Sequence, residues 1–374
     1  APRSAESVLA GLDPDQRAAV TAPVGIVVVR AGAGSGKTTV LTRRIAWRAL
    51  SETADIERVL AITFTRQAAT EMRSRLARFD LDGRPVIGTF HAIARRLMLQ
   101  FLEDRNRRIP VIVNNRSSLM SSCMGDDAKS GGIYDVLTAV DWAHAHMITP
   151  SKAAEKLAEA GLKIPLGARR FTEVFEQYER TKKKRGVIDL NDFMTSVIQE
   201  AKKDPRFIES IRFQYRHISV DEAQDMNPLQ YEFLKVLVPN AADLFLVGDP
   251  NQAIYGFNGA NKTLFDELPG FHAGAHVVSL PSNYRCTPEI VQMAVDTLAK
   301  DGQIADAQSK RLSGQVVRLE RCADDAAELK LITKLVQRAE NGQRTWNDIA
   351  VLVRINTLVE SIRKELSAAG IPLR

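Results

Sequence analysis

A glycine-rich turn that ends in lysine and threonine is the first feature of this sequence that could do chemistry. The turn, Ala31–Thr38, reads Ala-Gly-Ala-Gly-Ser-Gly-Lys-Thr and follows the apolar run 26–29. Glycines let consecutive backbone N–H groups turn toward an anion, and the helix expected next would point its positive end at phosphates. Lys37 would then bridge the β- and γ-phosphates, and the Thr38 hydroxyl would bind Mg²⁺. The alternative is a strand-to-helix turn without a ligand.

Two adjacent carboxylates after a second apolar run would complete such a site. Asp221 and Glu222 follow the run 217–220. Asp221 would hold Mg²⁺ through water, and Glu222 would orient and deprotonate the attacking water. Paired acids also occur in solvated turns, so the pair alone does not decide between a site and a turn. Together with the glycine-rich loop, it indicates a nucleotide-hydrolysing site.

Both segments belong to a recurring pattern of short apolar runs that lead into polar turns and then into helical spacing. We expect strands at 26–30, 59–63, 217–220, 244–247, 276–280 and 349–353. Near-continuous apolar strands that alternate with helices are typical of an α/β fold, a parallel sheet with helices on both faces. Ligands bind such sheets at the carboxyl ends of the strands, which is where the polar turns fall.

The pattern changes in two places, and these changes predict the domain organisation. Between about residues 92 and 213 apolar residues recur at helical spacing and no strand is expected, which indicates a helical insertion. Beyond Pro281 a second α/β pattern begins, with a strand near Val316 and helices over 326–338 and 358–368. The predicted domains are 1–91 together with 214–280, the insertion 92–213, and an incomplete second α/β domain 281–374.

Composition excludes several classes of protein. With 374 residues, 45% of them hydrophobic and 26% charged, the chain has ordinary globular usage, which argues against a disordered or collagen-like protein. No apolar run approaches the roughly 18–20 residues of a membrane span, and the first residues lack the apolar stretch of a secretory signal. Three scattered cysteines suit neither a disulfide framework nor a zinc site, so we expect a cytoplasmic protein. The net charge of +6 permits an anionic partner.

The order of the motifs resembles superfamily 1 helicases of the UvrD/Rep/PcrA group. Asp221–Asp225 is similar to their D-E-x-Q-D box, and their loop variant begins with alanine, as Ala31 does here. The other similar blocks are 12–16 (the Q motif), 63–72 (motif Ia), 88–91 (the block after it), 247–257 (motif III) and 283–285 (motif IV). The resemblance implies a RecA-like P-loop motor domain with a helical insertion and the start of a second RecA-like domain.

The resemblance also implies ATP and Mg²⁺ as cofactors. Gln16 would read the adenine edge and Tyr284 would stack on the adenine. Gln252 would sense the γ-phosphate, and Arg285 would act as an arginine finger. Alternatively, Gln16 is a solvated helix start, Tyr284 a core residue and Arg285 a surface ion-pair residue. The implied catalytic residues are Lys37, Asp221, Glu222, Gln252 and Arg285, the metal residues are Thr38 and Asp221, and the nucleotide-binding residues are Gln16, Ala31, Gly32, Ala33, Gly34, Ser35, Gly36, Lys37, Thr38, Thr39, Tyr284 and Arg285.

A groove for single-stranded DNA is implied as well. Its implied residues are Phe64, Thr65, Thr89, His91, Tyr255, Phe257, Arg354 and Asn356. Aromatic faces accept any base and give about 1–3 kcal/mol per stacked base, although each aromatic could be a core residue instead. The run Lys182–Arg185 could touch phosphates or end a solvated helix. Thr39 departs from the group's pattern, because many relatives have there an arginine that covers the other adenine face, and Leu190 and Asn258 stand where an aromatic residue and an arginine are frequent.

The implied function is an ATP-dependent 3′-to-5′ translocase or helicase that couples ATP hydrolysis to DNA unwinding. Its partners would be single-stranded DNA, single-strand/duplex junctions, and repair or nuclease proteins. The group's motifs V and VI are absent, so we expect an incomplete fragment that unwinds poorly. One alternative is an ATP-gated single-strand DNA-binding subunit without autonomous unwinding. Another is a small-molecule kinase, which would need no base-stacking aromatics.

Overall fold

The computed structural model describes most of the chain, namely residues 4–113, 115–238, 243–254, 256, 259–261, 263–266, 274–342 and 344–373. Contacts divide the chain into two compact units, Ala1–Gln315 and Val316–Arg374. Among the described residues, no helix combines the length and the apolar character that crossing a bilayer would require.

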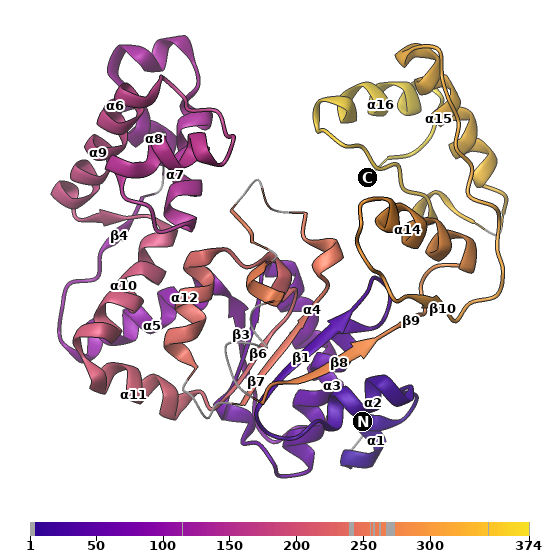
Figure 1. Ribbon diagram of the computed structural model, residues 1–374, viewed down its shortest axis with the longest axis horizontal. Coiled ribbons are helices and arrows are strands. Elements are labelled where there is room, and N and C mark those ends of the chain that lie inside the picture. The colour runs from indigo at the N-terminus through magenta and orange to yellow at the C-terminus, as the bar shows by residue number, and fades with distance from the viewer. Residues whose placement is uncertain are drawn as a thin grey trace. The chain divides into compact units, whose positions relative to one another are not determined.

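A six-stranded sheet forms the centre of the first unit (Figure 1). The strands are β1 (Ile26–Ala31), β2 (Val59–Thr63), β3 (Val86–Thr89), β6 (His217–Val220), β7 (Asp243–Gly248) and β8 (His276–Leu280). Their order is β3-β2-β6-β7-β1-β8, and every neighbouring pair is parallel. The predicted α/β fold is therefore confirmed. Strand β3 escaped prediction because its four residues include a glycine and a threonine and show too short an apolar run.

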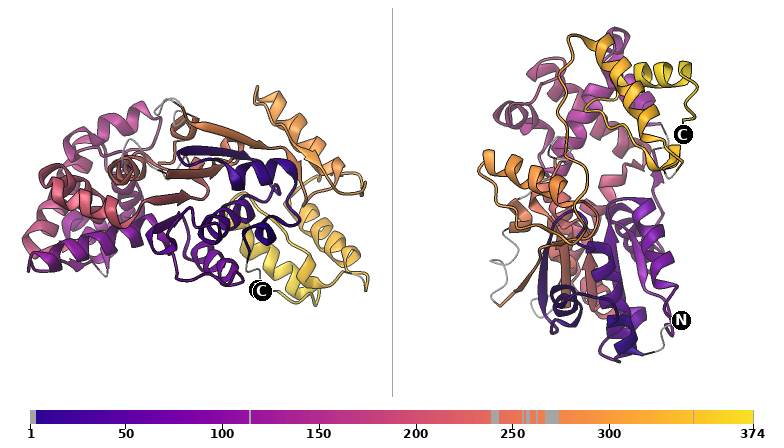
Figure 2. Two further views of the ribbon diagram at one scale, coloured as in Figure 1. Left: turned by 90° about the horizontal axis from the view of Figure 1, so that it is seen from below. Right: turned by 90° about the vertical axis from the view of Figure 1, so that its right-hand side faces the viewer.

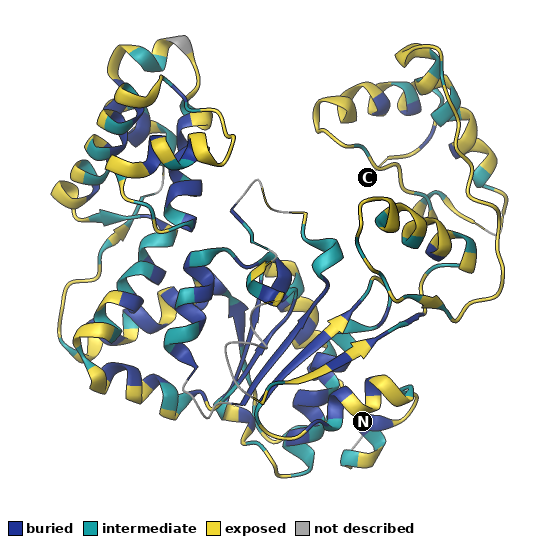
Figure 3. Cartoon of the chain, viewed as in Figure 1, coloured by how far each residue is buried: buried dark blue, intermediate teal, exposed yellow. Residues whose placement is uncertain are grey.

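Alternate residues of the strands point to opposite faces of the sheet, and helices cover both. Val28 packs on one face and Val27 on the other. The first face is covered by α5 (Phe90–Asp104), α10 (Leu190–Lys203), α11 (Pro205–Gln214) and α12 (Pro228–Leu237), and the second by α1 (Ala5–Leu9), α2 (Pro14–Thr21), α3 (Lys37–Leu50) and α4 (Arg66–Leu76). Figure 3 shows the central strands buried and parts of the edge strand β8 exposed.

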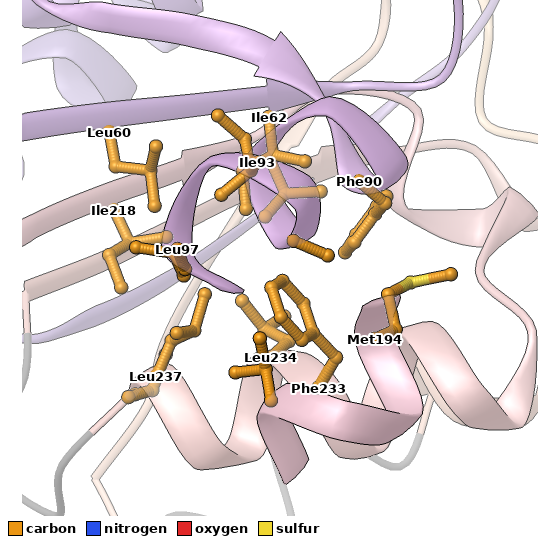
Figure 4. Packing of buried hydrophobic residues seen from close by; sticks show 14 of the residues in the cluster. Leu60, Ile62, Phe90, Ile93, Leu97, Met194, Ile218, Phe233, Leu234 and Leu237 are labelled. Carbon is orange, nitrogen blue, oxygen red and sulfur yellow. The ribbon is translucent and has the colours of Figure 1, made fainter. Parts of the chain in front are cut away.

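The first face has a continuous apolar core. Figure 4 shows Leu60 and Ile218 of the sheet meeting Leu97 of α5 and Leu237 of α12. The ring of Phe233 is fully buried and meets Phe90 edge to face, with ring centroids 6.5 Å apart. This packing fixes the start of α5, and hence the end of β3, relative to the rest of the sheet.

The helical insertion has a core of its own. Its helices are α6 (Arg116–Met124), α7 (Ile133–Ala145), α8 (Pro150–Glu159) and α9 (Ala168–Arg185), which gather in a group apart from α1–α4 (Figures 1 and 2). The prediction that this region contains no strand is wrong. Strands β4 (Val111–Ile112) and β5 (Val187–Ile188) pair in parallel where the chain enters and leaves the insertion. Two residues are too few to show a period, so no sequence pattern revealed them.

The chain after β8 forms small elements in both units. In the first unit, β9 (Ser282–Asn283) pairs with β10 (Gln308–Ser309), and α14 (Pro288–Lys300) lies between them in sequence. In the second unit, α15 (Asp325–Ala339) and α16 (Thr357–Ala368) share a small core around Val336 and Ile362.

The strands predicted near Val316 and at 349–353 are absent from the structure. Neither segment lies beside another strand within the described part of the second unit, and an extended segment needs such a neighbour for its N–H and C=O groups. The helices predicted over 326–338 and 358–368 are present as α15 and α16. The predicted domain boundaries stay a prediction.

Replacing Phe233 by alanine tests the packing in Figure 4. We expect Phe233→Ala to lower the free energy of unfolding by about 3–5 kcal/mol, because it removes a buried ring and leaves a cavity. The matched control is Phe213→Ala, whose side chain is 60% exposed, with an expected cost of about 1 kcal/mol or less. Chemical denaturation measures both, and equal costs for the two variants would contradict this core.

Candidate functional site

The polar turns at the carboxyl ends of four strands meet at one edge of the sheet. They follow β1, β6, β7 and β8, which are neighbours or near neighbours in the sheet. A cavity of about 300 Å³ opens at this edge. It is lined by Gly32, Ala33, Gly34, Gly36, Lys37, Thr38, Thr39, Arg75, Glu222, Gln252, Tyr284 and Arg285. The structure thus brings together most of the residues predicted for a nucleotide site, and it adds Arg75.

The carbonyl oxygens of the glycine-rich loop between β1 and α3 all accept hydrogen bonds from other groups of the protein. Gly34 and Gly36 have φ values of +72° and +89°, which side chains rarely adopt. Four successive carbonyl oxygens accept hydrogen bonds. The pairs are Gly32 with the Ser35 hydroxyl (2.8 Å), Ala33 with Asn283 Nδ2 (2.7 Å), Gly34 with the Tyr284 N–H (2.9 Å) and Ser35 with Gln16 Nε2 (2.8 Å). Peptide planes held in this way suit an anion, and the role of the loop in binding phosphate stays a prediction.

Lys37 places a buried ammonium group at the loop. Its Nζ lies 3.1 Å from Glu222 Oε2 as an ion pair, with 10% of the lysine side chain exposed. The Nζ makes no hydrogen bond to any described residue. Because a buried cation without hydrogen-bond acceptors is costly, this environment suits an anionic ligand such as a phosphate.

Asp221 and Thr38 offer two oxygen atoms that could hold Mg²⁺. Asp221 is 4% exposed, and its Oδ2 accepts from the Thr38 hydroxyl at 3.3 Å. Its Oδ1 accepts from the Glu222 N–H at 3.1 Å. Burial, and then the neighbouring charge of Glu222, raises the pKa of Asp221 to about 6. A hydroxyl and a carboxylate beside a phosphate site are ligands that Mg²⁺ takes together with water and phosphate oxygens.

Glu222 is held by a residue that the sequence analysis did not assign. Glu222 adopts the left-handed conformation, with φ +51°, an arrangement found at functional sites. The Nε2 of the buried Gln224 donates to Glu222 Oε2 at 3.0 Å, while its Oε1 accepts from the Asp249 N–H at 3.0 Å. Gln252 Nε2 in turn donates to Asp249 Oδ2 at 2.6 Å. The acidic turn after β6 is therefore linked to the turn after β7. Membership of Gln224 in the D-E-x-Q-D box was the signal that could have identified it.

Asn283 is a second residue that the sequence analysis left without a role. Its side chain, 5% exposed, donates to the loop at Ala33 and accepts at Oδ1 from the N–H groups of Arg285 (2.9 Å) and Cys286 (2.8 Å). A Cβ added to Gly34 would come 2.7 Å from the Cβ of Arg285, so the loop and the arginine pack backbone against side chain. Asn283 thus fixes the backbone of Arg285 at the cavity.

The predicted adenine contacts, Gln16 and Tyr284, are tied to each other through Asp13. Asp13 caps α2 by accepting from the Gln16 N–H at 2.7 Å, and its other oxygen accepts from the Tyr284 hydroxyl. Burial, and then this bond to Asp13, raises the pKa of Tyr284, which keeps the hydroxyl a donor. Gln16 uses its amide on Ser35, so its role toward adenine stays a prediction.

Two residues predicted to contact DNA lie at the ends of β2 and β3. Phe64 is partly buried, and its ring meets Phe90 edge to face at 5.4 Å, so it contributes to the core as well. His91 Nε2 lies 2.8 Å from Asn191 Oδ1, which fixes the orientation of the imidazole. Both groups sit at the same sheet edge as the cavity, on its β3–β2 side.

The remaining predicted DNA contacts differ in what the structure shows. The hydroxyls of Thr65 and Thr89 cap α4 and α5, accepting from N–H groups at 3.0 and 3.3 Å. Tyr255 and Phe257 lie outside the described residues, as does Asn258. Arg354 and Asn356 are exposed residues of the second unit. Of the run Lys182–Arg185, Lys182 is buried among Glu179, Asp189 and Asp192, so it is not a solvated residue.

Comparison with known families identifies the chain. Residues 12–271 match the model of the UvrD/REP helicase N-terminal domain, and residues 278–374 match that of the UvrD-like helicase C-terminal domain. The chain belongs to the UvrD/REP helicase family. This confirms the resemblance found in the sequence.

Curated UvrD/REP relatives are similar along nearly the whole chain. An "ATP-dependent DNA helicase UvrD2" of Mycobacterium tuberculosis is 33% identical over 395 residues, covering 98% of this chain and 55% of that protein. An "ATP-dependent DNA helicase UvrD1" of Mycobacterium leprae is 30% identical over 99% of this chain and 50% of that protein. A "DNA helicase II" of Haemophilus influenzae is 30% identical over 98% and 51%. The chain spans about half the length of the curated relatives it matches.

Removing the charge of Asp221 should stabilise this UvrD/REP chain in the absence of ligands. The folded-state pKa of about 6 exceeds the ordinary value of 3.8, so stability falls as pH rises through this interval. At pH 8 without Mg²⁺ or nucleotide we expect Asp221→Asn to raise the free energy of unfolding by on the order of 2 kcal/mol, and at about pH 4 by almost nothing.

Denaturation with chelator at both pH values measures this effect. The control Asp126→Asn alters an exposed carboxylate and should show no such pH-dependent gain. An Asp221→Asn variant that is less stable than the parent at pH 8 would mean that the carboxylate makes net favourable contacts.

Proposed function

We propose that this protein is an ATP-dependent 3′-to-5′ single-stranded DNA translocase and helicase that couples ATP hydrolysis to DNA unwinding. The observation that carries the proposal is the cavity in which Lys37, Glu222, Gln252 and Arg285 converge on the preorganised loop. Membership of the UvrD/REP family and the names of the relatives support it.

The residues of the cavity suit phosphoryl transfer to water. The loop N–H groups and the Lys37 ammonium would hold the β- and γ-phosphates, and Thr38 with Asp221 would hold Mg²⁺, which neutralises charge on phosphate oxygens. Glu222, oriented by Gln224, would take a proton from the attacking water. Arg285 would stabilise the charge that develops on the transferred group.

The arrangement of the sheet supports coupling between hydrolysis and DNA. The nucleotide residues follow β6, β7, β1 and β8, whereas Phe64 and His91 follow β2 and β3 on the same edge. Gln252 at the cavity is linked to Glu222 through Asp249 and Gln224. ATP would favour the closed arrangement in which Arg285 and Gln252 both reach its γ-phosphate, and such differential affinity is what shifts a conformational equilibrium. Release of that phosphate would favour the open arrangement again, and this change would move the protein along the DNA strand.

We further propose that this chain by itself binds ATP and single strands but unwinds duplex weakly. The chain spans about half of its relatives, and the described part of the second unit contains no sheet. An ATP-gated single-strand DNA-binding subunit is the second candidate, and the lack of a sheet in the described part of the second unit favours it. Single-strand/duplex junctions and repair or nuclease proteins are the proposed partners. The cytoplasm is the proposed location, because three scattered cysteines suit a reducing compartment.

ATP turnover with and without an oligo(dT) strand tests the proposed function. We expect the strand to raise the rate of ATP turnover by the parent chain. We expect the Lys37→Ala variant to lose nucleotide binding. Glu222→Gln should bind ATP normally but hydrolyse it about 10²–10⁴-fold more slowly, because the general base is lost. If the strand leaves the rate of ATP turnover unchanged, the proposal is contradicted. A small-molecule kinase would show this lack of response to DNA.

Replacing Phe64 separates its roles in DNA binding and in packing. Phe64→Leu keeps an apolar side chain against Phe90 but removes the aromatic face. We expect the free energy of binding to oligo(dT) to become less favourable by about 1–3 kcal/mol. Basal ATP turnover and thermal stability should stay close to those of the parent. Fluorescence anisotropy measures the affinity. A variant that loses stability but binds the strand as before would assign Phe64 to the core alone.

A further inference from the structure

A guanidinium group that no motif predicted lines the nucleotide cavity. Arg75 lies in the last turns of α4 and faces the cavity beside Thr39. Its Nη1 donates to the Thr39 hydroxyl at 3.3 Å, and its Nη2 donates to Glu71 Oε1 at 2.5 Å. The planar group is therefore held between two helices, α3 and α4, before any ligand arrives.

The contacts around the loop show which end of the cavity Arg75 occupies. Glu222 pairs with Lys37, so the side of the cavity that holds these two residues would receive the terminal phosphate. A Cβ on Gly36 would come 2.9 Å from Gln16 Nε2 and 3.8 Å from Thr39 Cβ, so Gln16 and Thr39 lie on one side of the loop. Arg75 is bonded to Thr39 and shares that side.

Tyr284 belongs to the same side of the loop. Its hydroxyl donates to Asp13, the residue that caps the helix of Gln16. Tyr284 and Arg75 therefore both line the part of the cavity toward which the sugar and base of a nucleotide must extend once its phosphates occupy the loop.

We propose that Arg75 is a nucleobase-binding residue, whose guanidinium stacks on the face of the base opposite Tyr284. A guanidinium is flat and weakly hydrated, and it stacks on aromatic faces. The threonine at position 39 is short enough to leave this face open, and its hydroxyl anchors the guanidinium there. The inference rests on the proposed ATP binding and names one of the residues that recognise the base.

Two ligands separate contact with the base from contact with the phosphates. ATP carries the base, and inorganic tripolyphosphate carries only the phosphate chain. We measure the affinity of the purified chain for each by competition with a fluorescent nucleotide, with Mg²⁺ present. Arg75→Ala should weaken ATP binding about tenfold and leave tripolyphosphate binding within about twofold of the parent.

Three further variants sharpen the comparison. Arg75→Met retains the aliphatic stem and should reproduce the loss, which guards against a folding defect of the alanine variant. Arg78→Ala removes the same charge from an exposed position near the end of α4, outside the cavity lining, and should leave both affinities unchanged. Thr39→Arg introduced into Arg75→Ala should restore ATP binding, because it returns a guanidinium to the same side of the loop.

The outcomes are distinct. Equal weakening of ATP and tripolyphosphate would make Arg75 a phosphate contact and overturn the proposal, as would unchanged ATP binding in both Arg75 variants. Failure of the proposed function has a different signature, namely a parent chain that binds ATP no better than Lys37→Ala does.

Discussion

A backbone loop binds an anion through its N–H groups when its carbonyl oxygens are directed away from the ligand, and this constraint organises the proposed nucleotide site. The carbonyls of the loop accept from Gln16, Asn283 and Tyr284, which come from the start of the chain and from the segment after β8. The loop is thus shaped by residues that also lie where adenine and the γ-phosphate would bind. The residues proposed to contact the nucleotide and the hydrogen bonds that shape the loop therefore belong to one network.

The electrostatics of the cavity favour a ligand over an empty site. Lys37 is a buried cation with one ion-pair partner and no hydrogen bond to a described residue, while burial raises the pKa of Asp221 and of Asp225 to about 6. Phosphates would satisfy the lysine, and a divalent cation would favour the charged carboxylate of Asp221. The free energy that these buried charges cost the unliganded protein would then contribute to binding of the proposed nucleotide and metal.

Much of the fold was predictable because it depends on local patterns. Five of the six strands of the main sheet and the helices over 326–338 and 358–368 follow from apolar periodicity. The failures have two causes. Strand β3 and the pair β4–β5 are too short to show a period, and the segment 349–353 has strand-like residues but no neighbouring strand to bond with. Periodicity reports which face is apolar, whereas strand formation also requires a partner.

The sequence by itself determined which groups are the candidates for the chemistry. The loop with Lys37 and Thr38 is one contiguous segment and the acids after β6 are another, so each can be found in the chain without the structure, and together they indicate a phosphate site. Only the tertiary structure decided the partners that hold these groups in place. Gln224 meets Asp249 across 25 residues, Arg75 meets Thr39 across 36, and Asn283 meets Ala33 across 250. The first and third of these contacts arise because parallel strands bring their carboxyl ends to one edge whatever their separation along the chain. The second joins α3 and α4, which pack on the same face of the sheet. No local pattern records which side chains then touch.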